Sequence, residues 1–555
     1  MSISVSFNQV TKICSFDQSN CIVIYCRLKA KKNPVPVQKS PLLVSKQGLK
    51  TGGTKYVMST SSAKTIPAVA THVVSPLQKK LIICFIGFTA ALAGLLFGLD
   101  IGVISGALPF VKNAFKLSIE AEGTVVSALL WGAVIGTLIS GMLSSNFGRR
   151  KAILISAVIF VVGSILCSIS QSELLLIGAR LFLGVAVGVA SFTAPLYLSE
   201  ISPQKVRGSL ISMYQLMITI GIVLAFLSDT WLASYATFGG VTGGHWRIML
   251  GVVAIPAAIM FVGVLFLPES PRWLFLKGFK DRGVAVFKGM HLDEAEIAAE
   301  VKGIEDNLKI KQNGFEMFKT NPNFRRAIGL GIGLQVIQQL TGINVVMYFA
   351  PTIFRIAGFA TTSAQEWGTV IVGITNVLAT FIAIAFVDRL GRKPIMYAGF
   401  VTMGLAMIAV GTVFNMGIEK HPELGYFAIF ALLIFIIGFA MSAGPIIWIL
   451  CSEIYPLTGR DLGVTFSTAT NWIANAIVGM TFLLLLAGFG NGNTFLLYGG
   501  LNVLFIIFFV IFVPETKGVS LEKIEANLLS GLPLRQIGRA PRARTTVEMR
   551  ETNNR

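Results

Sequence analysis

The sequence is dominated by apolar runs, each long enough to cross a lipid bilayer as a helix, which takes about 20 residues. Twelve such runs lie near 81–109, 123–144, 152–170, 174–199, 209–231, 247–267, 326–349, 367–387, 394–415, 425–451, 463–487 and 494–513. Composition agrees, because only 13% of the 555 residues are charged, about half the share usual in soluble proteins. We therefore expect an all-α membrane protein with twelve transmembrane helices. A soluble enzyme, a disulfide scaffold and a disordered chain are excluded.

Basic residues alternate between the loops that join these runs. Loops after even-numbered runs are basic, with Arg149, Arg150 and Lys151 after the second run, whereas loops after odd-numbered runs carry few cations. The net charge of +19 is concentrated in residues 1–80, which hold 12 Lys or Arg and one acid. Basic segments flanking spans stay in the cytoplasm. We expect both termini and the 268–325 loop to be cytoplasmic, and no binding of nucleic acid.

Three short motifs of the first half recur in the second half in the same order. They pair Gly148-Arg149-Arg150-Lys151 with Gly391-Arg392-Lys393, Glu200…Arg207 with Glu453…Arg460, and Pro268-Glu269-Ser270 with Pro514-Glu515-Thr516. The repetition predicts two pseudo-symmetric six-helix halves, an architecture typical of transporters that work by alternating access.

The predicted domain boundaries follow from this duplication. The segments are a basic, disordered N-terminal tail (1–80), the first bundle (81–267), a cytoplasmic loop with short amphipathic helices (268–325), the second bundle (326–513) and a cytoplasmic C-terminal tail (514–555). Met58 is an alternative start, which would leave residues 1–57 outside the mature protein.

The same motifs carry a family resemblance over residues 81–538. Phe147-Gly-Arg-Arg-Lys and Asp388-Arg-Leu-Gly-Arg-Lys resemble the loop signatures of the major facilitator superfamily. Pro268-Glu-Ser-Pro-Arg-Trp273, Gln338-Gln-Leu-Thr-Gly-Ile-Asn344 and Pro514-Glu-Thr-Lys517 resemble the sugar porters within it. The resemblance is strongest to the bacterial proton-coupled hexose porters of that family. It implies the major facilitator fold and transport of a sugar.

Amide side chains lie inside several of the apolar runs, where a polar group faces a cavity or another helix rather than lipid. Amides both donate and accept hydrogen bonds, as sugar hydroxyls require. Gln338 lies 12 residues into its run, about 18 Å deep, and Gly342 is placed to loosen the helix between Gln338 and Asn344. The predicted sugar site comprises Gln215, Gln338, Gln339, Asn344, Asn376 and Asn471, with Trp448 and Trp472 as stacking faces and Tyr348 as a gate. The alternative for any one amide is a hydrogen bond that only joins helices.

Asp100 is the only acid in the first apolar run. A charge at the centre of a membrane helix costs about 2.5–3.5 kcal/mol, so its presence calls for a function. Arg180 in the fourth run lies at a similar depth, about 10–14 Å from the same membrane surface. We predict that the two residues form a switch for proton coupling, and the resemblance supports this, because proton-coupled sugar porters carry Asp at this position. The alternative is a static ion pair.

Other charged residues lie at the cytoplasmic ends of the runs. They are Arg149, Glu200, Arg207, Asp388, Arg392, Glu453 and Arg460. We predict that ion pairs among them bridge the two halves and latch the outward-facing state. The alternative is that they only set the topology.

The sequence thus predicts a secondary active transporter that couples proton entry to uptake of a monosaccharide, a hexose such as galactose or glucose. An uncoupled sugar uniporter and a non-transporting sugar sensor are the alternatives. We expect no enzyme activity, no cofactor and no metal, because no nucleotide-binding loop or metal-ligand spacing is present. The expected partners are the sugar, protons and membrane lipid. The expected setting is a monomer in the bacterial inner membrane.

Overall fold

A computed structural model describes residues 76–538, apart from 204–205, 235–236, 239–240, 243–244, 291, 309–313, 419–420 and 520. The chain divides into two compact units, Met1–Val73 and Val74–Arg555, and the described residues belong to the second. The predicted N-terminal tail up to residue 75, Met58 and the end of the C-terminal tail lie outside the described residues. The rest of the chain is almost entirely helical, as the sequence predicts.

The first half consists of seven helices and a short hairpin. The helices are α1 (Pro76–Phe115), α2 (Ile119–Phe147), α3 (Arg149–Ser168), α4 (Glu173–Ile201), α5 (Arg207–Ala233), α6 (His245–Gly251) and α7 (Ala254–Leu265). The two-residue strands β1 (Thr237–Phe238) and β2 (Val241–Thr242) pair antiparallel between α5 and α6. This hairpin is the only departure from the predicted all-helical fold within the described segments. Its strands are too short to contribute to the bundle.

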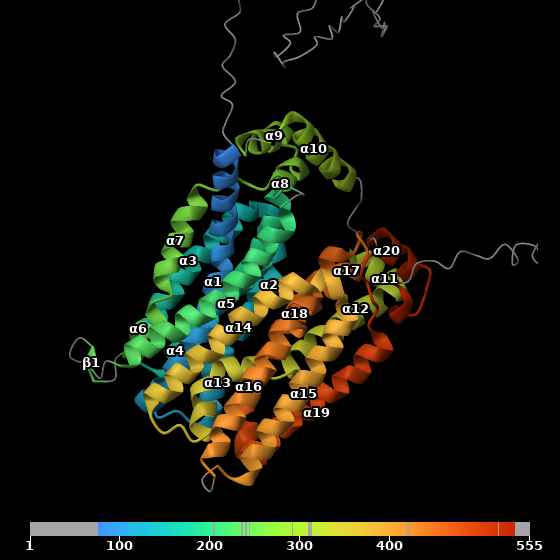
Figure 1. Cartoon of the computed structure of the whole chain (residues 1–555). Coiled ribbons are helices and arrows are strands. Elements are labelled where there is room, and N and C mark those ends of the chain that lie inside the picture. The colour runs from blue at the N-terminus through green and yellow to red at the C-terminus, as the bar shows by residue number, and fades with distance from the viewer. Residues whose placement is uncertain are drawn as a thin grey trace, which may run out of the picture. The chain divides into compact units, whose positions relative to one another are not determined.

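Four short helices connect the halves: α8 (Pro271–Leu276), α9 (Lys280–Gly289), α10 (Glu294–Leu308) and α11 (Gly314–Thr320). We name the end of the bundle that carries them the loop end, and the end that carries β1 and β2 the hairpin end. Figure 1 shows α8, α9 and α10 together at one end of the first half.

The second half repeats this plan. Its helices are α12 (Pro322–Leu340), α13 (Ile343–Ile356), α14 (Thr362–Leu390), α15 (Arg392–Met416), α16 (Glu423–Met441), α17 (Ala443–Glu453), α18 (Arg460–Phe489) and α19 (Asn491–Phe512). The helix α20 (Leu521–Leu529) and the 3-10 turn η1 (Leu534–Gln536) follow.

Among the described residues, eleven helical stretches are long and apolar enough to cross a membrane. They match eleven of the twelve predicted runs, and the remaining run, near 367–387, corresponds to the 29-residue helix α14. Three runs are broken rather than continuous, into α6 with α7, α12 with α13, and α16 with α17. The number of spans is therefore as predicted. Gly342 marks one of these breaks in the sequence, Gly444 and Pro445 lie just after another, and the break between α6 and α7 was not predicted.

Small residues bring the helices of the first half into close contact. Gly98 of α1 lies against the Ile218 carbonyl of α5, and Gly184 of α4 lies against the Leu129 carbonyl of α2. A side chain larger than hydrogen would separate these backbones, and such small-residue contacts are typical of membrane helices. The result is a tightly packed first half in which α1 pairs with α5 and α2 with α4.

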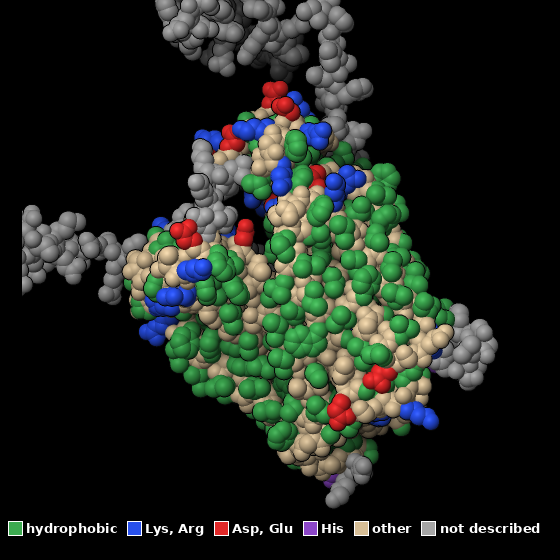
Figure 2. All heavy atoms as spheres, turned by 180° about the vertical axis from the view of Figure 1, so that it is seen from behind, with side chains coloured by type: hydrophobic (Ala, Val, Ile, Leu, Met, Phe, Trp, Pro, Cys, Tyr) green, Lys and Arg blue, Asp and Glu red, His purple; other side chains and the backbone are tan. Residues whose placement is uncertain are grey.

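The two halves meet through α2 with α18, α5 with α14 and α1 with α13. The surface that would face lipid is rich in exposed apolar side chains, among them Leu138, Leu174 and Ile259. Figure 2 shows hydrophobic side chains covering the flank of the molecule, with charged side chains gathered at its ends. This distribution is that of a membrane protein.

Candidate sugar and proton site

Asp100 of α1 and Arg180 of α4 are both buried in the first half, each with 1% of its surface exposed. Their charges interact electrostatically. No ion pair or hydrogen bond joins them directly, and the Arg180 Nε instead donates to the Val125 carbonyl at 2.7 Å. Asp100 Oδ2 and Arg180 Nη1 each find no hydrogen-bond partner among the described residues. The structure therefore holds the predicted pair close together but separated.

A cluster of amides occupies the second half, which we call the amide cluster (Gln335, Gln338, Gln339, Asn344 and Asn471). Asn471 of α18 donates to Gln335 Oε1 and to Gln338 Oε1 of α12, both at 2.7 Å. Asn344 of α13 donates to Gln339 Oε1 at 2.5 Å. The cluster joins three helices and presents several donors and acceptors in one place, which is what recognition of sugar hydroxyls requires.

Breaks in two spans place this cluster. Gly342 adopts a left-handed conformation with φ of 95° between α12 and α13, so that Asn344 turns back toward Gln339. Glycine takes this conformation without the steric penalty of a side chain. The predicted loosening of the helix at Gly342 is confirmed. Beside the second break, at Ser442, Gln338 Nε2 donates to the Ala443 and Gly444 carbonyls in the first turn of α17 at 2.9 and 3.1 Å.

The remaining predicted sugar-site residues occupy varied environments. Tyr348 is buried and its hydroxyl bonds to Asn475, with the Asn475 Nδ2 at 3.1 Å. Trp472 is buried and packs edge-on against Phe97 of α1, with ring centroids 5.1 Å apart. The other three are Gln215, half-buried on α5, Asn376, buried on α14, and Trp448, with 36% of its surface exposed on α17.

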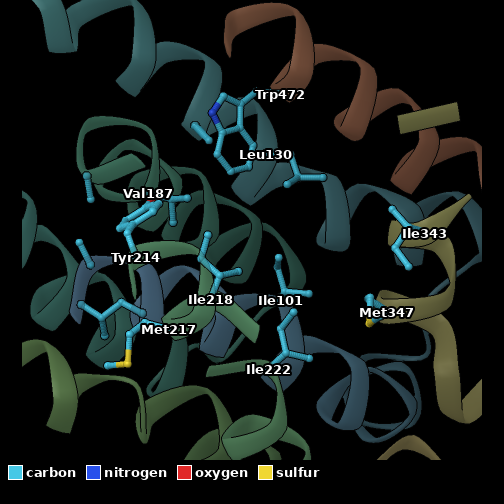
Figure 3. Close-up of a cluster of buried hydrophobic side chains, with 14 of the residues drawn as sticks. Ile101, Leu130, Val187, Tyr214, Met217, Ile218, Ile222, Ile343, Met347 and Trp472 are labelled. Atoms are coloured by element: carbon cyan, nitrogen blue, oxygen red, sulfur yellow. The ribbon is translucent and has the colours of Figure 1, made fainter. Parts of the chain in front are cut away.

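An apolar cluster adjoins these polar groups. It combines Ile101, Leu130, Tyr214 and Ile218 of the first half with Met347 and Trp472 of the second. Figure 3 shows these side chains in one close-up, together with Ile343 beside the break at Gly342. The described hydrogen-bonding amides thus come from the second half, whereas the first half contributes apolar side chains and the Asp100–Arg180 pair.

Two polar residues of this region were not singled out from the sequence. Gln335 lies one turn before Gln339 on α12 and accepts from Asn471. Asn475 lies one turn after Asn471 on α18 and bonds to Tyr348. Spacing of four residues puts each on the same helix face as a predicted residue. Applying the i, i+4 rule to Gln339 and Asn471 would have found both.

At the loop end, Arg149 and Glu200 form a bidentate ion pair, with Arg149 Nε 2.8 Å from Glu200 Oε2 and Arg149 Nη2 2.9 Å from Glu200 Oε1. The Ser270 hydroxyl donates to the same carboxylate at 2.5 Å. Glu269 accepts from the Arg150 backbone N–H at 3.0 Å, at the start of α3. These contacts tie the loops after the second, fourth and sixth spans together.

The second half repeats this arrangement with different residues. Arg392 Nη2 donates to Glu453 Oε1 at 2.9 Å, and the Thr516 hydroxyl donates to the other Glu453 oxygen at 2.5 Å. Glu515 accepts from the backbone N–H groups of Arg392 and Lys393 at 3.1 and 2.9 Å, at the start of α15. Burial disfavours the charged form of Glu515. The charged form is stabilised by hydrogen bonds from the backbone N–H groups of Arg392, Lys393 and Lys517, and by the charge of Arg392. Together these effects outweigh burial, so the pKa of Glu515 lies below its ordinary value.

The Arg149–Glu200 and Arg392–Glu453 ion pairs each join elements of the same half, so they are not the bridges between the halves that were predicted. Arg207 donates to the Ser202 carbonyl and pairs with Glu300 of α10 at 3.4 Å, and Arg460 donates to the Tyr455 carbonyl. At this end an electrostatic contact between the halves comes from Asp461 of α18, which interacts with Arg149 and Glu200. The side chain of Asp388 lies outside the described residues.

The structure combines spans that are broken in both halves, a buried amide cluster, and a buried acid near a buried arginine. This combination is that of a membrane carrier for a polar solute. The comparisons give the family. The model of the family "Sugar (and other) transporter" matches residues 86–528, so the chain belongs to this family of transporters and not to a family of enzymes. The resemblance seen in its motifs is confirmed.

Curated relatives match nearly their whole length. The galactose-proton symporter of Escherichia coli K12 is 56% identical over 82% of this chain and 96% of that protein. The arabinose-proton symporter of the same strain is 48% identical over 82% of this chain and 95% of that protein. The D-xylose transporter of Levilactobacillus brevis is 42% identical over 80% of this chain and 95% of that protein.

Solved structures confirm the major facilitator fold. A partially occluded, inward-open conformation of the E. coli xylose transporter XylE aligns with a TM-score of 0.69 and 30% identity, over 79% of this chain and 99% of that one. The structure of the same proton:xylose symporter bound to 6-bromo-6-deoxy-D-glucose aligns with a TM-score of 0.68 and 32% identity, over 81% and 99%.

Proposed function

We propose that this protein is a proton-coupled symporter that carries a monosaccharide, a hexose such as galactose or glucose, into the cell by alternating access. The observation that carries the proposal is the Asp100–Arg180 pair, buried and separated in the half that faces the amide cluster. The 56% identity to a galactose-proton symporter supports both the coupling and the hexose.

Coupling follows from the chemistry of a buried carboxylate. An ionised carboxylate deprived of water is tolerated only with a cationic partner, whereas a protonated one needs none. Arg180 is held away from Asp100 by its bond to the Val125 carbonyl. A proton on Asp100 stabilises this separated arrangement, and loss of the proton draws Arg180 back. The proton and the position of Arg180 are therefore linked, and a movement of α4 relative to α1 follows.

The sugar binds at the amide cluster, with Gln215, Asn376, Trp448 and Trp472 completing the site and Tyr348 closing it. In the structure the amides bond to one another, so that they are already oriented before a sugar arrives. Exchange of these amide–amide bonds for amide–hydroxyl bonds leaves no buried donor unpaired, whereas a sugar lacking one hydroxyl leaves an orphan that costs about 1–3 kcal/mol. Selectivity between hexoses arises in this way.

The charged residues at the loop end form a latch for each half. Arg149–Glu200 and Arg392–Glu453 hold the spans of one half together as a rigid body, while Arg207, Arg460 and Asp388 complete the charged surface. Asp461 links the halves at this end through its interaction with Arg149. Separation of Asp461 from Arg149 accompanies opening toward the cytoplasm.

The loop end is cytoplasmic, because it carries the basic loops. Both termini lie on this side of a bacterial inner membrane, and the functional unit is a monomer surrounded by lipid. Cysteine substitution at exposed positions of the two ends, followed by labelling with an impermeant reagent in intact cells, tests the orientation. Labelling of Lys280→Cys from outside the cell would reverse it.

The coupling is tested with Asp100→Asn in proteoliposomes. The amide cannot exchange a proton, so uphill accumulation of D-galactose driven by an imposed proton gradient should be abolished, while exchange of internal for external sugar continues. Ser105→Ala, which removes a buried hydroxyl from the same helix, serves as the control. Accumulation at the wild-type level in Asp100→Asn would refute the coupling role.

The same assay separates the alternatives when D-galactose and D-glucose are each supplied to the wild-type protein. Uptake that ignores the proton gradient would identify an uncoupled uniporter. Saturable binding of sugar without any flux would identify a sensor.

A further inference from the structure

Three titratable side chains near the hairpin end have no part in the mechanism described so far. Asp229 of α5, Glu366 of α14 and His245 of α6 are buried, with 0%, 2% and 5% of their surfaces exposed. Each comes from a different helix. Under the proposed topology this end faces the outside of the cell, from which the coupling proton enters.

Asp229 and Glu366 approach each other across the contact between the two halves. They interact electrostatically, and α5 packs against α14. Glu366 Oε2 and both Asp229 oxygens make no hydrogen bond of good geometry among the described residues, although the Gly106 backbone lies close enough to act on Asp229. Two carboxylates in a buried interface without a cation cannot both be ionised, because each would lack water and repel the other. The pair therefore retains at least one exchangeable proton.

His245 lies beside this pair along α1. Asp229 packs against Gly106, where an added methyl group would come within 2.5 Å of Asp229 Oδ2. His245 packs edge-on against Phe110, with ring centroids 4.1 Å apart. Gly106 and Phe110 are four residues apart and so share one face of the helix. Both ring nitrogens of His245 are also without a described partner.

Asp100 lies on the same helix, six residues before Gly106 and about 9 Å deeper. In order of depth the groups are His245, the Asp229–Glu366 pair and Asp100, with Asp100 about 120° around α1 from Gly106. Each of them holds at least one polar atom without a described partner. Chains of Asp, Glu and His inside a membrane protein are typical of proton pathways.

The neighbouring cations are engaged elsewhere. Lys112 of α1 pairs with Glu122 of α2 at 2.5 Å. Arg247 of α6 donates to the Ser170 carbonyl at 2.8 Å and lies over the Trp246 ring at 4.1 Å. On α14 and α5, the charged groups described near the hairpin end are Glu366 and Asp229 themselves. A structural role as partners of a buried cation therefore does not account for the pair.

We propose that His245, Asp229 and Glu366 form an outer proton relay that delivers the coupling proton from external water to Asp100. One proton enters at His245 or the carboxylate pair, and one leaves the pair for Asp100, so that the relay returns to its starting charge. Since Asp229 and Glu366 belong to different halves, opening at the hairpin end exposes them to external water, where a proton is taken up, and closure brings the pair together again. The inference rests on the proposed proton coupling.

The test uses Asp229→Asn and Glu366→Gln in the full-length protein in proteoliposomes. Sugar-induced proton uptake is followed with a pH-indicator dye on addition of D-galactose or D-glucose, and sugar exchange is measured in parallel. We expect the proton-uptake rate to fall by about tenfold or more, as loss of a positioned proton carrier typically causes. Exchange, which needs no net proton movement, should stay within twofold of wild type.

Ser228→Ala is the matched control, because it removes a neighbouring polar side chain that bonds only to its own helix, at the Ala225 carbonyl. Retained sugar binding and an unchanged melting temperature show that a variant is folded. His245→Phe keeps the ring contact with Phe110 and removes both nitrogens, and the same selective loss is expected.

Equal loss of exchange and proton uptake in Asp229→Asn and Glu366→Gln would overturn the relay and leave a structural role. Wild-type proton uptake in both variants would overturn it as well, and wild-type kinetics in His245→Phe alone would overturn its outermost step. Failure of the coupling proposal itself is distinct, because the wild-type protein would then show no sugar-induced proton uptake at all.

Discussion

At the scale of single residues, Gln338 shows how the sugar site is prepared. Its side-chain nitrogen donates to the Ala443 and Gly444 carbonyls beside the break at Ser442, and its oxygen accepts from Asn471. Such a residue is fixed in orientation before substrate binds. A fixed donor and acceptor recognise a hydroxyl group without the further loss of side-chain entropy that ordering a mobile amide would entail.

Gln338→Leu should therefore raise the Kd for D-galactose by about 5- to 160-fold, because a matched buried hydrogen bond is worth about 1–3 kcal/mol. Binding to purified protein by calorimetry measures the effect. Asn502→Leu is the control, since Asn502 is a buried amide of the same half that bonds to the Thr341 and Tyr498 carbonyls instead. Equal affinities of Gln338→Leu and wild type would show that the cluster only joins helices.

At the scale of helices, two carboxylates cap the helices that begin after the duplicated basic loops. Glu269 accepts at the start of α3 and Glu515 at the start of α15. Backbone N–H groups at a helix N-terminus carry partial positive charge, so an acid there stabilises the helix. The duplicated Pro-Glu-Ser and Pro-Glu-Thr motifs are thus explained by one physical role.

Glu515→Gln should lower stability at neutral pH by about 1 kcal/mol, because the charged cap becomes neutral. Since the folded pKa of Glu515 lies below its ordinary value of 4.5, the stabilisation is fully present above that value. It is lost as the pH falls through the folded pKa. The melting temperatures of variant and wild type should therefore differ by a constant amount above pH 5 and converge at lower pH. A difference that persists unchanged at pH 3 would contradict this account.

Much of this arrangement could be predicted from the sequence, because hydrophobic length, loop charge and duplication are local properties. The spans, the break at Gly342 and the amides of the site follow from such patterns. The pairing of Arg149 with Glu200 inside one half could not be predicted, because the sequence does not say which of several charged loop ends meet. The separation of Asp100 from Arg180 could not be predicted either, because it involves the Val125 carbonyl of a third helix.

At the scale of the whole molecule, contacts between the halves recur near the hairpin end. A methyl group added to Gly123 of α2 would lie 2.6 Å from the Met480 carbonyl oxygen of α18. Gly373 of α14 lies against Phe226 of α5 in the same way. Glycines at these points let the halves close on the outer side, as alternating access requires before the site can open to the cytoplasm.

Gly123→Trp should hold the outer side open, because an indole cannot fit against the Met480 carbonyl. Net uptake and exchange should both be abolished, since each needs the outer side to close, while sugar still binds to the outward-facing site. Flux in proteoliposomes together with calorimetric binding separates these effects. Gly141→Trp is the matched control on the same helix, because no atom lies within 4 Å of a methyl group added there. Exchange at the wild-type rate in Gly123→Trp would mean that the contact between α2 and α18 at the hairpin end is not an obligatory gate, and the halves would have to close elsewhere along α5 and α14.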